Sequence, residues 1–296
     1  MRIGIDLGGT KTEAVLMNAA GEILERIRKP TPANEGYEAI INSISGIVSE
    51  IEKHAGSTCY IGIGTPGSLA PGTNLLRNSN TVCLNNQPFK QDLESRLGRE
   101  IRMANDANCF TLSEAIDGAG AGCATVFGVI MGTGVGGGIV VNQKLIEGKQ
   151  HIAGEWGHNL LDPNGADCYC GRRGCVETCL SGPGLIQSYR RAGGATNAGS
   201  HEIVAAARTG EKLASQVMEQ YLEYFGRALA TVINILDPDV VILGGGMSGI
   251  DELYDKGRSA VARHVFNESL LTPIVSNRHG DSSGVRGAAW LWDPDE

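Results

Sequence analysis

The sequence lacks the features that are typical of nucleic-acid-binding proteins, membrane-spanning proteins and proteins with a signal peptide. It has no excess of basic residues: 25 Lys and Arg face 33 Asp and Glu, for a formal net charge of −8. A nucleic-acid-binding protein usually shows a basic face, so this charge argues against one. No apolar run approaches the roughly 18 residues that a membrane-spanning helix needs. Asp6 also precedes any signal-peptide core, so we expect a cytoplasmic protein of about two domains.

Two nucleotide-binding signatures are also missing. The only Gly-Lys pair, Gly148-Lys149, is followed by Gln150, so there is no Walker A motif. Residues 132–137 match G-x-G-x-x-G, but that pattern indicates dinucleotide binding only between a strand and a helix. Residues 139–141 read as a strand, which argues against a Rossmann fold.

Glycine, in contrast, is abundant, with 42 residues gathered largely into turns. Strands at 3–7 and 12–17 flank Gly8-Gly9, and a third strand is expected at 22–28. Strands at 126–131 and 138–141 flank the second glycine-rich turn. The second strand–turn–strand segment resembles the first, which hints at a duplicated core. A further strand, 240–243, opens into three more glycines.

Such hairpin turns can bind phosphate, because inward-facing backbone N–H groups form an anion site that a missing Cβ leaves accessible. The alternative is an ordinary hairpin turn that needs glycine at positive φ. Thr10, Thr133 and Lys11 favour the phosphate interpretation. Asp6 does so as well, since a carboxylate beside a phosphate makes sense with Mg²⁺ between them.

The other expected elements are helices at 37–52, 107–116 and 216–236 and strands at 59–64 and 101–105. The last helix ends at Asp237-Pro238. Residues 193–200 are expected to form an exposed loop. No Pro-, Ser- or Gly-rich linker divides the chain, so we expect two closely joined domains.

Asn105-Asp106-Ala107-Asn108 lies between an expected strand and an expected helix. One interpretation is a helix N-cap, a position that Asp and Asn favour. The other is catalytic: a carboxylate fixed at a helix start can accept a proton from a substrate hydroxyl during phosphoryl transfer. The two interpretations are compatible.

A histidine and three cysteines form a possible metal site. His158 precedes Cys168, Cys170 and Cys175, and a Cys₃His set suits tetrahedral Zn²⁺. Four protein ligands leave no open position, so such a site would be structural. The alternative is free thiols. Four other cysteines, which are expected to be small buried residues, lack ligand spacing: Cys59, Cys83, Cys109 and Cys123. Cys179 reads as helix interior.

Taken in order along the chain, these segments resemble the ROK family of bacterial sugar kinases and sugar-responsive repressors. The matching segments are Asp6–Lys11, Asn105–Asn108, Gly132–Gly138, Glu155–His158, Cys168–Glu177 and Leu243–Ser248. They span nearly the whole chain. The resemblance implies an actin-like, ribonuclease-H-like α/β fold of two domains with ATP and sugar in the cleft. We expect residues 1–117 plus 283–296 in the smaller domain, and 118–282 in the larger, zinc-carrying one.

The resemblance also implies roles for individual residues. Asp106 matches the catalytic base, and residues that match sugar-binding positions are Asn80, Asn105, Asp106, Glu155, His158 and Glu177. His158 would also bind zinc with the three cysteines. Residues that match the ATP-binding positions are Gly4, Ile5, Asp6, Leu7, Gly8, Gly9, Thr10, Lys11, Thr133, Gly134, Val135, Gly136, Gly137, Gly138, Ile139, Val140, Gly244, Gly245 and Gly246. ATP, Mg²⁺ and structural Zn²⁺ are the expected cofactors.

Within the family, the sequence is most similar to the fructokinase and manno(fructo)kinase branch, so fructose is the first expected substrate. The segments behind this are 84–89, 154–159 and 279–290. The short segment 160–167 and Cys83 depart from that branch near the sugar, so mannose, glucose and N-acetylhexosamines stay open. A sugar-responsive repressor is the less favoured alternative, because the phosphate hairpin begins at Met1 without a preceding helix-turn-helix segment. The resemblance favours a homodimer.

Overall fold

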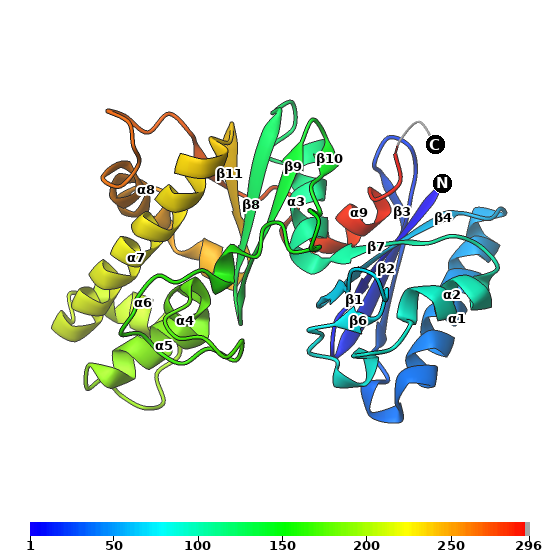
Figure 1. Cartoon of the computed structure of the whole chain (residues 1–296), viewed down its shortest axis with the longest axis horizontal. Coiled ribbons are helices and arrows are strands. Elements are labelled where there is room, and N and C mark those ends of the chain that lie inside the picture. Colours follow the sequence, from blue (N-terminus) through cyan, green and yellow to red (C-terminus); the bar gives the residue numbers. More distant parts are fainter. Residues whose placement is uncertain (294–296) are drawn as a thin grey trace. The chain divides into compact units, whose positions relative to one another are not determined.

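The protein forms a mixed α/β structure with two five-stranded sheets, shown in Figure 1. This computed structural model describes residues 1–293 of the 296. One compact unit (unit 1) holds residues 1–122, 138–153 and 278–293, and the other (unit 2) holds 123–137 and 154–277. The domain limits expected from the sequence, at 117 and 283, stay a prediction.

The strands carry most of the predicted glycine-rich segments at their ends. They are β1 (Arg2–Leu7), β2 (Lys11–Met17), β3 (Ile23–Pro30), β4 (Tyr60–Thr65), β5 (Ser68–Leu69), β6 (Leu76–Arg77), β7 (Arg102–Asn105), β8 (Thr125–Met131), β9 (Val135–Val141), β10 (Lys144–Leu145), β11 (Val240–Gly244) and β12 (Ile274–Ser276).

The helices vary from one short turn to a long amphipathic rod. They are α1 (Tyr37–Ala55), α2 (Phe89–Leu97), α3 (Asp106–Ile116), α4 (Val176–Leu180), α5 (Gly182–Arg191), α6 (Ser200–Arg208), α7 (Lys212–Leu236), α8 (Lys256–Ala262) and α9 (Ser283–Ala289). In the part of the chain that the structure describes, no helix is long and apolar enough to cross a membrane.

The first sheet brings together the strand ends that the sequence marks as functional. Its order is β3-β2-β1-β4-β7, with β1, β4 and β7 parallel. Parallel strands end at the same sheet edge. Asp6 is therefore in register with Gly64, and Thr65 with Asn105. The carboxyl ends of these strands form the part of unit 1 on which Asp6 and Asp106 are placed.

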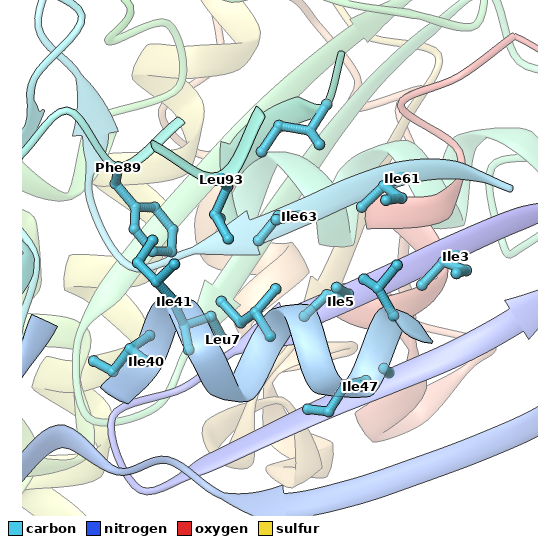
Figure 2. Close-up of a cluster of buried hydrophobic side chains, with 14 of the residues drawn as sticks. Ile3, Ile5, Leu7, Ile40, Ile41, Ile47, Ile61, Ile63, Phe89 and Leu93 are labelled. Atoms are coloured by element: carbon cyan, nitrogen blue, oxygen red, sulfur yellow. The ribbon is translucent and has the colours of Figure 1, made fainter. Parts of the chain in front are cut away.

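Side chains alternate between the two faces of this sheet. Ile3, Ile5 and Leu7 are fully buried with the apolar face of α1, as Figure 2 shows. The alternating apolar residues of β1 and the helical spacing of residues 40–51 predicted this packing, and both predictions are confirmed.

The opposite face of the sheet is built for close contact with α9. A Cβ atom on Gly4 would overlap the carbonyl of Val285, and one on Gly62 would overlap that of Ala288. These two glycines therefore allow the helix backbone to lie directly on β1 and β4. Gly4, one of the expected ATP-binding residues, thus has a packing role of its own.

The second sheet has the order β10-β9-β8-β11-β12, with β8, β11 and β12 parallel. Both sheets thus run third-second-first-fourth-fifth in their own strands, as the hint of a duplicated core predicted. The long helix α7 begins at Lys212, four residues before the predicted start, because the Glu211 side chain accepts the Leu213 N–H at 3.1 Å. It ends at Leu236, as predicted.

Two of the cysteines expected to be buried are not. Cys59 and Cys109 are buried, but Cys83 and Cys123 are half-buried. The error has a simple cause, because cysteine spacing reports on metal binding and carries no information about burial. Cys179 lies in α4 and is buried, as predicted.

Candidate active site

The turn between β1 and β2 is tight, and its glycines allow neighbouring atoms to lie close to the backbone. The Gly8 N–H donates to the Lys11 carbonyl at 3.0 Å, and a Cβ on Gly8 would lie 2.8 Å from that oxygen. Neither Gly8 nor Gly9 has a positive φ, so the hairpin interpretation based on positive φ is wrong here. A Cβ on Gly9 would lie 3.7 Å from the Asn80 side-chain oxygen. The turn therefore presents bare backbone beside Asn80.

Asp6 and Asp106 form a pair of mutually unfavourable charges in unit 1. Burial raises the pKa of Asp6 to about 6, and the negative charges of Asp106 and Glu13 add to this shift while Lys11 opposes it. A Cβ on Gly284 of α9 would lie 3.4 Å from an Asp6 carboxylate oxygen. This concentration of negative charge at the glycine turn is suited to a divalent cation.

Asp106 is held by its own helix start. Asn105 is the N-cap of α3 and accepts the Asn108 N–H at 2.8 Å, while Asp106 accepts the Ala107 N–H at 2.8 Å. The side chain of Asp106 reaches solvent, but the protein around it desolvates the carboxyl and raises its pKa, against the Ala107 N–H. Capping and a base-like carboxylate thus occur in the same turn.

Unit 1 also contains a cavity of ≈ 900 Å³ that borders this turn. Gly67, Ser68, Asn105 and Asn108 are among its lining residues. The Asn108 side-chain oxygen is buried and has no hydrogen-bond partner among the described residues. Such an atom indicates a missing polar partner. Sequence reasoning missed Ser68, and it did not include Asn108 among the sugar-binding residues.

The second glycine turn, in unit 2, is also shaped by a carboxylate. Gly132 N–H donates to the Gly134 carbonyl at 2.9 Å, so β9 begins at Val135, earlier than predicted. The Val135 N–H donates to Glu177 Oε2 at 3.0 Å, and a Cβ on Gly134 would lie 2.6 Å from the same oxygen. Glycine at 134 therefore makes room for Glu177, while Thr133 at the tip is exposed.

The third glycine segment follows β11 in the same unit. Gly245 has a φ of +80°, and a Cβ there would overlap the Met131 carbonyl at the end of β8. A side chain at this position would be unfavourable both because of the positive φ and because of this overlap. Gly244–Gly246 is thus a backbone-only loop beside the end of β8.

Glu155 and His158 are positioned by the tryptophan between them. Residues Trp156–His158 form a short 3₁₀ turn, and the Trp156 indole N–H donates to the Gly136 carbonyl at 3.0 Å. Trp156 is buried and packs edge-on against Phe127. A Cβ on Gly157 would overlap the Val135 carbonyl, so this turn lies directly on β9.

The four predicted metal ligands gather in one place. The ligand atoms of His158, Cys168, Cys170 and Cys175 all lie within 4.8 Å of one another. His158 Nδ1 is 3.6 Å from Cys168 Sγ, and the sulfurs of Cys170 and Cys175 are 3.7 Å apart. A tetrahedral zinc ion with bonds of about 2.0–2.3 Å has ligands separated by about 3.5–3.8 Å, so the set fits Zn²⁺.

Tyr169, between two of these cysteines, was given no role from the sequence. Its hydroxyl lies 3.1 Å from His158 Nε2. Although the Tyr169 side chain is 81% exposed, the loop around it desolvates the hydroxyl and raises the pKa of Tyr169 to about 12, and the negative charges of Glu177, Cys168 and Glu155 add to the effect. Only its place between the two cysteines of the C-x-C pair could have drawn attention to it.

Comparison with known proteins decides the family. The sequence profile of the ROK family matches residues 2–294. The chain belongs to the ROK family. It is 38% identical over 303 residues to an N-acetyl-D-glucosamine kinase of Haemophilus influenzae, covering 99% of both chains. The protein is accordingly a sugar kinase.

Solved structures of ROK proteins share the fold. A ROK hexokinase from Thermus thermophilus matches with a TM-score of 0.88 and 31% identity, over 98% of this chain and 96% of that one. A ROK glucokinase from Streptomyces griseus, in complex with glucose and AMPPNP, matches with a TM-score of 0.77 and 30% identity over 98% of both chains. The predicted actin-like α/β fold is confirmed.

In this ROK protein, the predicted site residues are divided between the two units. Unit 1 holds Asp6, the first turn, Asn80, Asn105 and Asp106. Unit 2 holds the second turn through Gly137, Glu155, His158, Glu177, the three cysteines and Gly244–Gly246. Ile5 and Leu7 have fully buried side chains, so only their backbone atoms are available to a nucleotide.

Proposed function

We propose that this ROK kinase transfers the γ-phosphoryl group of ATP to the 6-hydroxyl of an N-acetylhexosamine, N-acetyl-D-glucosamine first. The carboxylate of Asp106, fixed at the start of α3 with a raised pKa, is the observation that carries the chemistry. The sugar is supported by the full-length similarity to N-acetyl-D-glucosamine kinases.

Asp106 acts as the general base. A carboxylate with an elevated pKa accepts a proton from an attacking hydroxyl more readily than an ordinary aspartate. Its hydrogen bond with the Ala107 N–H restricts its orientation, and Asn105 fixes the turn on which it sits. The sugar hydroxyl loses its proton to Asp106 as its oxygen forms the bond to the γ-phosphorus, and ADP leaves.

The glycine segments bind ATP through backbone groups. In unit 1, Gly9 offers a backbone N–H group without a side chain, and Asp6 is the proposed residue to hold Mg²⁺ directly or through water. In unit 2, the glycines of residues 133–137 and the Gly244–Gly246 loop offer similar bare backbone, while the Val135 N–H is bonded to Glu177. The AMPPNP complex of the related glucokinase supports ATP as the phosphoryl donor.

The sugar is recognised by amide and carboxylate side chains. Asn80 and Asn105 in unit 1 and Glu155, His158 and Glu177 in unit 2 are the proposed partners of its hydroxyls. Asn108, with its unpaired buried oxygen, and Ser68 are further proposed partners in unit 1, because they line the cavity together with Asn105. The relatives favour an acetamido sugar over fructose, the first expectation from the sequence.

The Cys₃His cluster is proposed to hold a structural zinc ion. All four coordination positions come from the protein, so the ion supplies cross-linking of the loop and leaves phosphoryl transfer to other groups. With zinc bound, Nδ1 of His158 would face the metal, and Nε2 would remain for hydrogen bonding. Assembly as a homodimer in the cytoplasm stays a prediction.

Replacement of Asp106 tests this mechanism. Asp106→Asn keeps the shape of the side chain and removes the base, so kcat should fall about 10²–10⁴-fold while the melting temperature holds. Release of ADP in the presence of N-acetylglucosamine and Mg²⁺ measures the effect. Asp237→Asn, at the exposed left-handed end of α7, is the matched control, since asparagine tolerates that conformation. Near-normal turnover of Asp106→Asn would reject the assignment.

A further inference from the structure

The segment that follows β10 is joined to the β5–β6 hairpin by two hydrogen bonds. The Arg77 guanidinium donates to the Gln150 carbonyl at 3.0 Å, and Nδ1 of His151 lies 3.2 Å from the Leu69 carbonyl oxygen. His151 has a φ of +53°, which is uncommon for a residue with a side chain. Such a backbone conformation persists where the surrounding structure fixes it, often at ligand-binding sites. The two bonds therefore hold His151 in a conformation that costs free energy.

One ring nitrogen of His151 is left for a ligand. The Leu69 carbonyl can only accept a hydrogen bond, so Nδ1 carries a proton, and Nε2 of the neutral ring is an acceptor. Among the described residues, Nε2 has no hydrogen-bond partner. His151 is half-buried and lines the cavity of unit 1 together with Ser68, Asn105 and Asn108, three of the proposed sugar partners. The residues around this cavity thus include an acceptor that the proposed function has not used.

The covalent structure of a hexose indicates which group meets this acceptor. In a pyranose ring C2 lies across from C5, which carries the 6-hydroxymethyl group. With its 6-hydroxyl at Asp106, the sugar directs its C2 substituent away from the start of α3, so residues of other segments must receive that substituent. Leu69 and His151 are lining residues on two such segments. An acetamido group at C2 has one N–H donor of fixed direction, and leaving that donor unpaired in a cavity is costly.

We propose that His151 recognises the acetamido group of the sugar, with Nε2 accepting the amide N–H while the Leu69 carbonyl fixes Nδ1. His151 is thus a substrate-contacting residue that favours N-acetylhexosamines. This inference rests on the proposed function, because it assigns a contact to the same sugar. A histidine that only joined the two segments would need Nδ1 alone, so the role of Nε2 can be tested separately.

The test is His151→Asn. Asparagine tolerates a positive φ, and its side-chain NH₂ can replace Nδ1 against Leu69 while Nε2 is lost. The kcat/KM for N-acetylglucosamine should fall about tenfold, as for loss of one hydrogen bond, and the sugar Kd from calorimetry should rise in parallel. For 2-deoxyglucose, which has no donor at C2, both quantities should stay within about twofold of wild type. The melting temperature should hold.

His54→Asn, in the exposed last turn of α1, is the matched control and should match wild type with both sugars. An unchanged kcat/KM for N-acetylglucosamine in His151→Asn, or an equal fall for both sugars, would overturn the inference. A wild-type protein that does not phosphorylate N-acetylglucosamine would instead reject the proposed function, and the two failures are therefore distinguishable.

Discussion

Some residues of this site carry a charge that destabilises the folded protein when no ligand is bound. Asp6 shows this most clearly, because its folded pKa of about 6 is above the ordinary value of 3.8. A carboxyl whose pKa rises on folding favours the native state at low pH, and this benefit is lost as the pH rises through about 6. At neutral pH, the ionised Asp6 therefore destabilises the ligand-free protein.

The first prediction follows from the direction of this pKa shift. Asp6→Asn should stabilise the ligand-free protein at pH 7.5 by about 1–3 kcal/mol and reduce kinase activity at least tenfold, since the proposed Mg²⁺ partner is lost. The gain should shrink at pH 4.5, where wild-type Asp6 is protonated in the native state. Urea unfolding at both pH values, without Mg²⁺ or nucleotide, measures it. A less stable Asp6→Asn protein at pH 7.5 would contradict the account.

Gly134 gives a second prediction at this scale. A methyl group there would lie 2.6 Å from Glu177 Oε2, so Gly134→Ala should displace that carboxylate and break its bond to the Val135 N–H. We expect kcat/KM for the sugar to fall about 10- to 100-fold with little change in melting temperature. Gly46→Ala in α1, where a Cβ meets nothing within 4 Å, is the control. Equal kinetics for both variants would show that the position of Glu177 is unimportant.

At the scale of elements, α9 is held to α3 by one buried carboxylate. Glu114 is fully buried and accepts the N–H groups of Arg278, Ala119 and His279 and the hydroxyl of Ser283. Burial alone would raise the pKa of Glu114, but these hydrogen bonds hold it below its usual range. Its contribution to stability is present above the unfolded pKa and is lost as the pH falls through the folded one.

Glu114→Gln should therefore lower the free energy of unfolding by about 2–4 kcal/mol at pH 7, because an amide replaces a carboxylate acceptor of four hydrogen bonds. The difference from wild type should narrow as the pH drops to the acid range. Thermal melts from pH 7 downward measure both effects, with the exposed Glu219→Gln on α7 as control. Identical melting curves for wild type and Glu114→Gln would refute the role of this carboxylate.

The elements that periodicity could predict are the ones with large apolar side chains. The isoleucines of α1 and the alternation in β1 reveal both structures directly. Helix α9 carried no such signal, because its Ser-Gly-Val-Arg-Gly-Ala-Ala sequence has small residues where a helix usually shows apolar ones. Those small residues, with Gly4 and Gly62, are what permit its close contact with the sheet.

Part of the candidate site, like part of the fold, could be predicted from the sequence. Asp106 and the metal ligands could be named because their spacing reflects local chemistry. The contact of Tyr169 with His158 and the space for Glu177 beside Gly134 depend on how separate segments pack, which no local pattern contains.

At the scale of the whole molecule, metal removal should affect stability and sugar binding together. Chelation should lower the melting temperature by about 5 °C or more and raise the sugar KM, because the Cys168–Cys175 loop and His158 lose their common anchor. Zinc should restore both. Cys175→Ser, treated alike, should show no further response to the chelator. Full activity and melting temperature after verified metal loss would contradict a structural zinc site.

The preference of the enzyme for an acetamido sugar can be measured by comparing kcat/KM across several sugars. ADP release would be followed with N-acetylglucosamine, N-acetylmannosamine, glucose, mannose and fructose under the same ATP and Mg²⁺ concentrations. We expect the highest kcat/KM for N-acetylglucosamine, by at least about tenfold over glucose and fructose, with a 6-phosphate product identified by NMR. A higher kcat/KM for fructose or for any sugar without an acetamido group would contradict it.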